Sequence, residues 1–374
     1  MNLRVDHSVT TVASGAGGVA TAVRHLAESQ AAMGCLVHVH ALTPADSIPG
    51  VSMHGYLPNK CFPRSLGRSR ALRLGLSKAA RETDVLHSHN LWSDGAMYAA
   101  SATRGTACRL VCSPHGGLHP RSLAVSAWRK RLAWSLRQQA TLQAADLLHA
   151  TSEQEASHCR LVGLTNPVVV IPLGVDLPSL QEGTAARGLR RLAFLGRLHR
   201  IKAIDNLLEA WKSVAARHPD WELVIRGPDG GVEPVLRRMA SQAPRVTFGP
   251  AVSPGERAAW YRSCDLVVLP SHAENFGLVV AEALAAAVPV IASTGTPWSR
   301  LPAEGCGWWV DNDVDALAGA FDAAMSVPPA RLHAMGARGR DWMAKEFTWS
   351  SVTNRMIDAY RWICGLGPKP PDAR

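Results

Sequence analysis

A chain of 374 residues is longer than one hydrophobic core usually serves, so we expect two domains of about 150–200 residues each. The hydrophobic fraction of 47% is ordinary for a globular protein, and no apolar run is long enough for a transmembrane helix. The net charge of +10 lies mainly in residues 1–175, with 17 Lys and Arg against 9 Asp and Glu, which implies an anionic partner such as a phospholipid surface, a phosphorylated acceptor or nucleic acid.

The eight cysteines are scattered, and only Cys108 and Cys112 lie close together in the sequence. No second pair and no nearby histidine completes a zinc-binding spacing, so we expect reduced cysteines in a cytoplasmic protein. The N-terminal run MNLRVDHSVTTVASG has charged residues inside its only apolar stretch, which argues against a signal peptide.

Short β-rich runs alternate with longer helical patterns, which predicts an α/β fold of parallel sheets built from βαβ units. We expect an N-terminal domain over 1–175, a Gly- and Pro-rich linker over 176–189, and a second domain over 190–347. A C-terminal helix and tail, 348–374, could cross back to the N-terminal domain. Both domains should be doubly wound and Rossmann-like, with ligands bound beyond the carboxyl ends of the strands in an interdomain cleft.

The predicted elements follow from hydrophobic periodicity. The predicted strands are 3–11, 35–42, 84–89, 109–114, 146–151 and 168–172 in the first half, and 190–196, 221–227, 245–250, 265–270, 289–293 and 307–310 in the second. The predicted helices are 18–33, 92–103, 121–144 and 152–162, then 203–217, 231–241, 254–263, 277–287, 313–326, 330–345 and 348–363.

A glycine-rich loop, SGAGGVATAVRHLA, follows the first strand, and Gly15, Gly17 and Ala20 match the dinucleotide fingerprint G-x-G-x-x-G/A. That fingerprint also requires an acidic residue at the end of the second strand. The first acid after this strand is Asp46, beyond Thr43 and Pro44, which disfavours NAD. Glycines before a helix still leave backbone N–H groups free for an anion, and a tight turn without a ligand is the simpler alternative.

Two basic segments lie in the N-terminal half, 59–81 and 120–143, and the second carries Trp128 and Trp134. One interpretation is a solvated helix face with the tryptophans in the core. The other is an interfacial surface that meets anionic lipid headgroups, with tryptophan at the boundary. Nucleic acid is not expected as a partner, because no recognised binding motif accompanies the charge.

Three histidines end predicted strands of the N-terminal half. His115 lies in Ser-Pro-His-Gly-Gly and is either a structural histidine or a functional one facing the cleft; its Pro and Gly neighbours favour the functional interpretation. His87 and His89, in VLHSHNLW, either line the acceptor side of the cleft or pack in the core.

In the second half, Arg197 and Lys202 flank the junction between a strand and a helix. Two cations beside a helix N-terminus suit a diphosphate, although solvated cations are common at such positions. Further on, Glu274 lies in the loop after strand 265–270, and Glu282 lies one and a half turns into the next helix. Both carboxylates can accept hydrogen bonds from sugar hydroxyls. The alternative is that both are ordinary solvated residues.

The stretch Asn275, Phe276, Gly277 and Leu278 places free backbone N–H groups at the start of that helix, which suits an anion. The spacing Glu-x7-Glu around Phe-Gly-Leu, preceded by Gly-Arg-Leu-x3-Lys, resembles the retaining glycosyltransferases of family 4, which have the GT-B fold. The resemblance covers essentially the whole chain, including the glycine loop and the segments Ser113–Gly116 and Ile171–Asp176.

The resemblance implies a role for each matching position in the second domain. Arg197 and Lys202 would neutralise the departing nucleoside diphosphate. Glu282 would bind the ribose hydroxyls, Glu274 the hydroxyls of the donor sugar, and the amides of Phe276 to Leu278 the sugar and the distal phosphate. The family often has Gly after this Lys, where the chain has Ala203; we expect Ala to occupy a helix start without strain.

In the first domain the resemblance implies that Gly17 and Gly18 leave room for the donor phosphates and the acceptor. His115 would sit beside the transferred sugar at the catalytic centre. The donor would be a nucleoside-diphosphate sugar used as a co-substrate, with no cofactor. The acceptor would be a glycan or a polyprenyl-diphosphate-linked oligosaccharide, as in bacterial exopolysaccharide, O-antigen or capsule synthesis, with the protein peripheral at the inner face of the plasma membrane.

The chemistry that the resemblance implies is transfer with retention of anomeric configuration, by same-face attack in which the leaving phosphate takes the proton of the acceptor. No Asp or Glu stands out as a covalent nucleophile, and we expect no catalytic metal. Fixed cations near the diphosphate would bind the transition state more strongly than the ground state. Two alternatives are open: a catalytically inactive sugar-nucleotide-binding or scaffold protein, and a disfavoured NAD-linked oxidoreductase.

Overall fold

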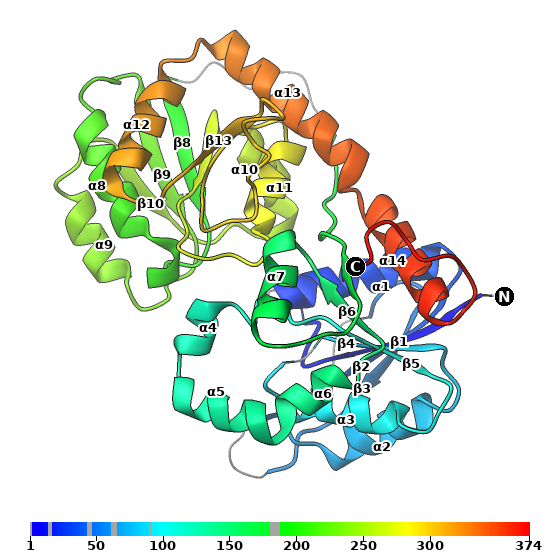
Figure 1. Cartoon of the computed structure of the whole chain (residues 1–374). Helices are drawn as coiled ribbons and strands as arrows, with labels where there is room; N and C mark the ends of the chain where they lie inside the picture. The colour runs from blue at the N-terminus through cyan, green and yellow to red at the C-terminus, as the bar shows by residue number, and fades with distance from the viewer. Residues whose placement is uncertain (1, 14–16, 43–46, 61–65, 90, 180–187) are drawn as a thin grey trace. The chain divides into compact units, whose positions relative to one another are not determined.

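The computed structural model describes residues 2–13, 17–42, 47–60, 66–89, 91–179 and 188–374 (Figure 1). The chain divides into two compact units, which we describe separately. The first unit contains residues 1–174 together with 349–374, and the second contains residues 175–348.

The first unit is built on a parallel seven-stranded sheet with the strand order β3-β2-β1-β4-β5-β6-β7. Its strands are β1 (Arg4–Val9), β2 (Leu36–Ala41), β3 (Val51–Gly55), β4 (Val85–Ser88), β5 (Arg109–Cys112), β6 (Leu147–Ala150) and β7 (Val168–Val170). Its helices are α1 (Gly18–Ala32), α2 (Arg70–Ala79), α3 (Asp94–Thr103), α4 (Pro120–Ala124), α5 (Ala127–Ala133), the π-helix η2 (Trp134–Gln138), α6 (Gln139–Gln143), α7 (Glu153–Leu161) and α14 (Trp349–Ile363).

The second unit is built on a parallel six-stranded sheet with the order β10-β9-β8-β11-β12-β13. Its strands are β8 (Arg190–Leu195), β9 (Trp221–Arg226), β10 (Val246–Gly249), β11 (Leu266–Leu269), β12 (Val290–Ser293) and β13 (Gly307–Val310). Its helices are the 3₁₀ turn η3 (Arg200–Lys202), α8 (Ile204–Val214), α9 (Glu233–Ala240), the 3₁₀ turn η4 (Pro254–Glu256), α10 (Arg257–Arg262), α11 (Leu278–Ala285), α12 (Val314–Met325) and α13 (Pro329–Glu346).

The prediction of two doubly wound parallel-sheet domains is confirmed. In both units helices cover the two faces of the sheet, so the central strands are buried throughout; every residue of β4, β6, β11 and β12 is buried. Strands buried on both faces need continuous apolar runs, which is why LVVL and VIAS read as strands in the sequence.

Both sheets reverse their strand order at one point, between β1 and β4 in the first unit and between β8 and β11 in the second. The strands on either side of this point pair directly, as Val5 does with Val85 and Leu192 with Leu266. Loops leaving the carboxyl ends of these two strands diverge to opposite faces and leave a crevice, where ligands of such sheets bind.

The sequence patterns were wrong about parts of the first unit. They missed β3, a half-exposed edge strand whose sequence VSMHG alternates apolar and polar residues over only four positions. They also missed α2, in which arginines mask a buried stripe of Leu72, Leu76 and Ala79. The single helix predicted over 121–144 is interrupted at Ser126, which has φ of +55°, and then passes through a π-helical turn.

The C-terminal segment belongs to the first unit. In Figure 1 the red helix α14 lies beside the blue helix α1, and its buried residues Met356 and Tyr360 join the core cluster of β1 and β4. The tail then pairs with β7 through Val168 and Arg374, whose amides each donate to the carbonyl of the other. In the described part of the chain, no helix combines the length and the hydropathy needed to cross a membrane.

Close packing of α13 against the turn after α11 gives a test of the fold. A Cβ added at Gly336 would lie 1.9 Å from the Ala287 carbonyl oxygen, so Gly336→Ala must displace backbone and should lower the free energy of unfolding by about 1–3 kcal/mol. Gly319, on the exposed side of α12, has nothing within 4 Å of the added atom. Gly319→Ala should therefore raise stability by about 0.5–1 kcal/mol. Urea unfolding followed by tryptophan fluorescence measures both, and equal effects would contradict this packing.

Candidate active site

The strand-order reversal of the second unit brings together Lys202 and Glu274, two of the predicted site residues. Lys202 ends η3, which follows β8, and Glu274 lies in the loop after β11. The Lys202 ammonium donates to the Glu274 carboxylate, and Ser271 Oγ donates to the same carboxylate oxygen over 2.7 Å. Both charged side chains are mostly buried, 19% and 14% exposed. The sequence analysis missed Ser271, although its place directly after a strand was a usable signal.

The loops that carry this ion pair are fastened to each other by backbone contacts. The amide of His272 donates to the Ile201 carbonyl over 2.8 Å, and the amide of Glu274 donates to the Gly295 carbonyl over 2.9 Å. A Cβ at Gly295 would lie 2.4 Å from the Ser271 carbonyl oxygen, so only glycine allows this approach. The positions of the two charges are therefore set by the main chain.

Arg197 lies in the turn after β8 and is exposed. Within the described residues, no carboxylate lies at ion-pair distance from its guanidinium, so it differs from Lys202 in having its charge uncompensated. A Cβ at Gly230 would lie 3.2 Å from Arg197 Cγ and 2.5 Å from the Leu198 carbonyl oxygen. The close approach of the turn after β9 therefore fixes the backbone that carries Arg197.

The expectation that Ala203 occupies a relaxed helix start is wrong. Ala203 is buried and has φ of +49°, in the left-handed region, between η3 and α8. A side chain with a Cβ is strained there by about 1–2 kcal/mol, and glycine would not be. The strain is tolerated because η3 and α8 fix the residues on both sides of it.

The predicted anion-binding stretch lies at the start of α11. Gly277 adopts φ of +78° and directly precedes Leu278, the first residue of the helix. The first amides of a helix have no partner inside it. Phe276 is buried and its carbonyl accepts from Trp298 Nε1 over 2.6 Å, while Asn275 is half-buried in the same loop.

Glu282 is held by two partners that the sequence analysis did not identify. Arg257 donates to one carboxylate oxygen over 2.7 Å and Tyr261 to the other over 2.8 Å. Burial raises the pKa of Tyr261 well above its ordinary value, and the Glu282 carboxylate raises it further, so the phenol stays a donor. Each carboxylate oxygen can accept a second hydrogen bond. The spacing of Arg257 and Tyr261, four residues apart on one helix, was the available signal.

In the first unit the glycine loop is described from Gly17 onward, and Gly15 lies outside the described residues. Gly17 is the N-cap of α1 with φ of +106°, and Gly18 is its first residue; both are exposed. The amides at this helix start follow β1, one of the two strands at the order reversal of the sheet. The positions are compatible with an anion near the helix N-terminus.

His115 occupies a tight turn after β5, with φ of +49°. The turn is held by Glu155, a buried residue of α7 that the sequence analysis missed. One Glu155 oxygen accepts from the Gly116 amide over 2.6 Å, and the other accepts from the amide and hydroxyl of Thr151. The imidazole of His115 contacts that of His89, whose Nδ1 lies 3.0 Å from His115 Nε2.

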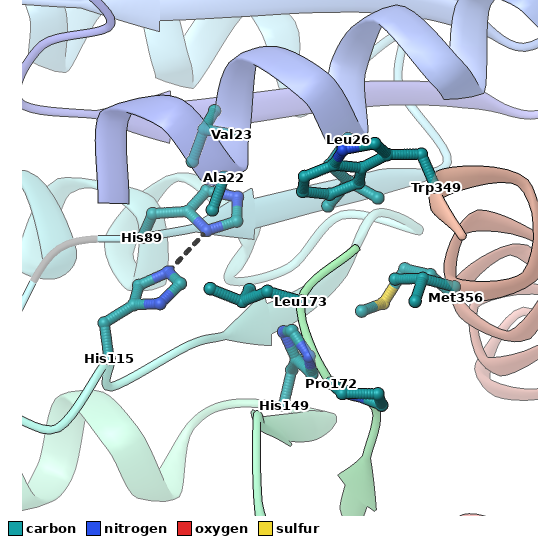
Figure 2. A pocket seen from close by; sticks show the side chains of 11 residues that line it. Ala22, Val23, Leu26, His89, His115, His149, Pro172, Leu173, Trp349 and Met356 are labelled. Atoms are coloured by element: carbon teal, nitrogen blue, oxygen red, sulfur yellow. Dashed lines mark hydrogen bonds between the residues drawn. The ribbon is translucent and has the colours of Figure 1, made fainter. Parts of the chain in front are cut away.

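A small pocket lies between these imidazoles and α14 (Figure 2). Its volume of about 10 Å³ is close to that of one water molecule, and its walls are mainly apolar. Figure 2 shows His89, His115 and His149 on one side and Trp349 and Met356 on the other. A sugar does not fit this pocket, so it is not a donor site.

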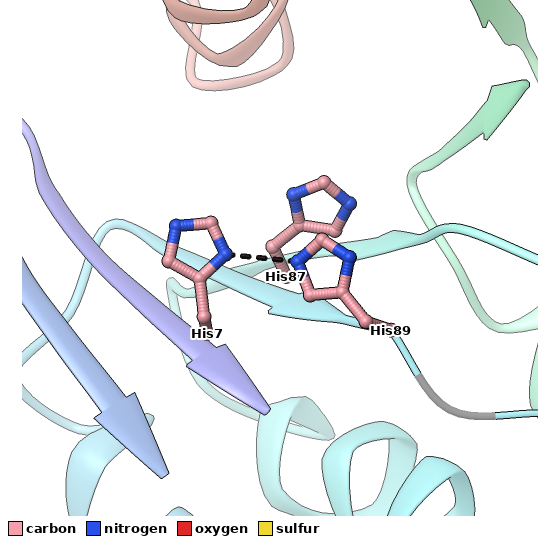
Figure 3. Close-up of side chains that lie close together, drawn as sticks. All are labelled: His7, His87 and His89. Atoms are coloured by element: carbon pink, nitrogen blue, oxygen red, sulfur yellow. Dashed lines mark hydrogen bonds between the residues drawn. The ribbon is translucent and has the colours of Figure 1, made fainter. Parts of the chain in front are cut away.

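His7, His87 and His89 are buried, and each offers a ring nitrogen within 4.8 Å of those of the others, close enough to hold a metal ion (Figure 3). Their nitrogens already have partners: His7 Nδ1 lies 2.9 Å from His89 Nε2, and His7 Nε2 lies 2.7 Å from Gln30 Oε1. A metal ion here would have to break the His7–His89 hydrogen bond. The sequence analysis treated His87 and His89 as either ligand-side or core residues; the structure buries both.

The sequence also contains the spacing Asp-x-Asp at Asp311 and Asp313, a pattern that can hold a metal. Asp313 caps α12 by accepting from the Ala316 amide over 2.8 Å, and Asp311 accepts from Thr294 Oγ1 over 2.9 Å. Both carboxylates therefore have local structural roles.

Comparison with known proteins identifies the family. Residues 16–178 match the family described as "Glycosyltransferase Family 4", and residues 190–326 match "Glycosyl transferases group 1". The D-inositol 3-phosphate glycosyltransferase 1 of Catenulispora acidiphila is 31% identical over 330 residues, 80% of this chain and 76% of that protein. The D-inositol 3-phosphate glycosyltransferase of Segniliparus rotundus is 32% identical over 236 residues, which are 58% of this chain and about half, 52%, of that protein.

Among solved structures, the Anabaena protein HepE in complex with UDP and glucose aligns with a TM-score of 0.74 at 16% identity, covering 96% of this chain and 99% of that one. Both units thus have the fold of the GT-B glycosyltransferases. The chain belongs to glycosyltransferase family 4, which sets the NAD-linked alternative aside.

Burial keeps the imidazoles of His7, His115 and His149 neutral and gives a test by pH. Desolvation lowers the pKa of His7 and His149 to about 4 and that of His115 to about 3, while each would titrate near 6.5 in the unfolded chain. Between pH 6.5 and 5 the unfolded state therefore binds more protons, and stability must fall as the pH falls, by about 1.4 kcal/mol per pH unit for each such imidazole.

We expect urea midpoints to fall steeply from pH 7 to pH 5, and His149→Gln, which removes one of these groups, to have a shallower slope. Carboxylates stay ionised in both states over most of this window, so they contribute little. A flat profile would show that the imidazoles are protonated in the folded protein.

Proposed function

We propose that the protein transfers a sugar from a nucleoside-diphosphate sugar to a hydroxyl of an acceptor, with retention of anomeric configuration and without a catalytic metal. The observation that carries the proposal is the ion pair of Lys202 and Glu274 where the second sheet reverses its strand order. It combines a cation for a diphosphate with a carboxylate for hydroxyls. The relatives named as inositol phosphate glycosyltransferases and the neighbour solved with UDP and glucose support a donor of this class.

The proposed donor contacts follow from the geometry. Lys202 and Arg197 neutralise the charge that develops on the leaving diphosphate, a stabilisation that is larger in the transition state than in the ground state. Glu274 accepts from hydroxyls of the sugar. Glu282, held by Arg257 and Tyr261, has acceptor capacity left for the ribose.

The remaining proposed contacts come from helix starts and from the first unit. The amides from Phe276 through Leu278, next to Asn275, bind the sugar and the distal phosphate at the N-terminus of α11. Gly17 and Gly18 leave space beside α1 for phosphate and acceptor. His115 contacts the transferred sugar.

Two substitutions test the donor site. Lys202→Ala and Glu274→Ala should each lower turnover at least ~100-fold, because each removes a group that acts on the reacting sugar phosphate. Slow hydrolysis and thermal shift with a panel of UDP-, GDP- and ADP-sugars measure the effect and identify the donor. Arg237→Ala, which breaks an exposed ion pair on α9, is the matched control and should retain wild-type rates.

The outcomes distinguish an active glycosyltransferase from the remaining alternative, a catalytically inactive binding protein. A protein that is shifted by a sugar nucleotide but never hydrolyses or transfers it is an inactive binding protein. Near-normal rates in either Ala variant would contradict the assignment of Lys202 and Glu274. The anomeric configuration of the product, determined by NMR, decides retention.

We propose further that the first unit docks on an anionic membrane surface, which suits a lipid-linked glycan acceptor. The support is an exposed apolar stripe along α5 and η2, formed by Trp128, Leu132 and Leu136 at intervals of four residues, with Val125 in the turn before it. These four side chains are 54–69% exposed. Exposed Arg129 and Arg131 flank the stripe, and no carboxylate of the described residues lies at ion-pair distance from either. Trp134, in contrast, packs against the core. Trp128 therefore fits the interfacial interpretation, and Trp134 fits the core interpretation.

Liposome flotation tests the membrane proposal. The wild-type protein should float with vesicles containing anionic phospholipid at low salt and dissociate as salt screens the charges. Trp128→Ser with Leu132→Ser should abolish flotation. Leu161→Ser, which removes another exposed leucine of the same unit from α7, should not. Absence of wild-type binding to anionic vesicles at low salt would overturn the proposal.

A further inference from the structure

A continuous chain of hydrogen bonds runs through the interior of the first unit and begins at the carbonyl oxygen of Ile171. His149 Nε2 lies 2.8 Å from this oxygen, and His149 Nδ1 lies 2.8 Å from Ser113 Oγ. Ser113 Oγ lies 2.7 Å from His87 Nε2, and His87 Nδ1 lies 2.6 Å from the hydroxyl of Tyr360 on α14. Every side chain in this half of the chain is buried.

The second half continues from Tyr360 to His115. The Tyr360 hydroxyl lies 3.4 Å from Gln30 Nε2, the longest contact of the chain, and Gln30 Oε1 lies 2.7 Å from His7 Nε2. His7 Nδ1 lies 2.9 Å from His89 Nε2, and His89 Nδ1 lies 3.0 Å from His115 Nε2. Figure 3 shows the His7–His89 contact and Figure 2 the His89–His115 contact.

The carbonyl at one end determines which atom donates in every contact of the first half. A carbonyl oxygen only accepts, so His149 Nε2 carries the proton, and Nδ1 of the neutral ring accepts. Ser113 has a single hydroxyl hydrogen, which it donates to His149, so it accepts from His87 Nε2. His87 Nδ1 is then an acceptor and receives the hydrogen of Tyr360.

The same reasoning passes through the second half. The Tyr360 oxygen accepts from the Gln30 amide nitrogen, which leaves Gln30 Oε1 to accept from His7 Nε2. His7 Nδ1 accepts from His89 Nε2, and His89 Nδ1 accepts from His115 Nε2. All five imidazoles are therefore protonated on Nε2 alone, and each contact has one donor and one acceptor.

We infer that this chain fixes the tautomer of His115, with the proton on Nε2 and a bare lone pair on Nδ1, and that Ser113, Tyr360 and Gln30 are positioning residues for it. Within the described residues, Nδ1 of His115 has no hydrogen-bond partner. A neutral ring with a lone pair accepts from a hydroxyl and repels an anion. Given the proposed function, on which this part rests, His115 selects a sugar hydroxyl rather than a phosphate.

The low pKa values support the neutrality that the chain requires. Burial lowers the pKa of all five imidazoles, to about 4 for His7 and His149 and about 3 for His115. A doubly protonated ring would donate from both nitrogens. One of its N–H groups would then face the N–H or O–H donor of the next group in the chain, and that hydrogen bond would be lost. A metal ion on His7, His87 and His89 is the competing interpretation, and it would remove the donors that the chain needs.

Nitrogen NMR of the full-length protein tests the inference without any ligand. With ¹⁵N-labelled histidine, two-bond ¹H–¹⁵N correlations distinguish protonated from bare ring nitrogens, and the signals lost in His115→Gln assign this residue among the 15 histidines. In the wild type we expect His115 to show one signal set with a bare Nδ1. Ser113→Ala and Tyr360→Phe each cut the chain from its carbonyl end. A second His115 signal set with a protonated Nδ1 should then emerge in both variants.

Thr353→Val is the matched control. Thr353 is a fully buried residue of α14 whose hydroxyl has no hydrogen-bond partner among the described residues. Its replacement therefore removes a buried hydroxyl outside the hydrogen-bonded chain and should leave the His115 signals unchanged. A wild-type His115 protonated on Nδ1, or signals that ignore Ser113→Ala and Tyr360→Phe, would overturn the inference. So would one metal ion per chain in the purified protein, with the His7 and His89 signals shifted by its removal.

An activity readout separates this inference from the proposed function. If a nucleotide sugar is hydrolysed, Tyr360→Phe should lower kcat/KM roughly fivefold, the loss of about one neutral hydrogen bond, while Thr353→Val should not. If no donor is hydrolysed but the NMR result holds, the proposed function fails and the fixed tautomer stands. If the enzyme is active, and Ser113→Ala and Tyr360→Phe keep both the wild-type rate and the wild-type tautomer of His115, the inference on His115 fails while the proposed function stands.

Discussion

The second unit depends on the ion pair between Lys202 and Glu274. Two mostly buried charges have lost much of their hydration, and removing either one would leave the other uncompensated, so the loops after β8 and β11 must stay adjacent. The backbone contacts of Ile201 and Gly295 serve the same end. A site ordered in this way before a ligand arrives needs little reorganisation during the reaction, which is the condition under which fixed charges stabilise a transition state most.

In the first unit, by contrast, the low pKa values keep five linked imidazoles uncharged: His7, His87, His89, His115 and His149. Burying a polar group without a partner costs free energy, so each buried ring nitrogen of the hydrogen-bonded chain must meet a group of complementary type. The alternation of donors and acceptors from Ile171 to His115 meets that requirement. Its middle contact comes from Tyr360, on a helix 273 residues away from His87 in the sequence, so the C-terminal segment is part of this interior.

The sequence predicted the architecture and the pairing of loops, because buried strands leave continuous apolar runs and parallel strands place their following loops at one edge. It could not predict partners, which depend on side-chain directions. Glu282 meets Arg257 and Tyr261, whose spacing of four residues was only a weak signal. Ala203 takes a left-handed conformation, for which the one hint was that the family often has Gly at this position. The hydrogen-bonded chain of imidazoles could not be predicted for the same reason, since its members come from separate strands and from two helices. The sequence did not predict the edge strand β3, because a half-exposed strand needs no continuous apolar run.

In the proposed function the two units offer different chemistry to the two ends of a sugar nucleotide. The donor is charged at its diphosphate and neutral at its hydroxyls. Lys202 and Arg197 of the second unit would match the diphosphate, and the neutral ring of His115 would match a hydroxyl. An imidazolium at His115 would bind phosphate as well as hydroxyl and would weaken this distinction. A neutral His115 is thus a physical means of orienting the substrate, because an anion at this ring would meet a lone pair instead of a donor.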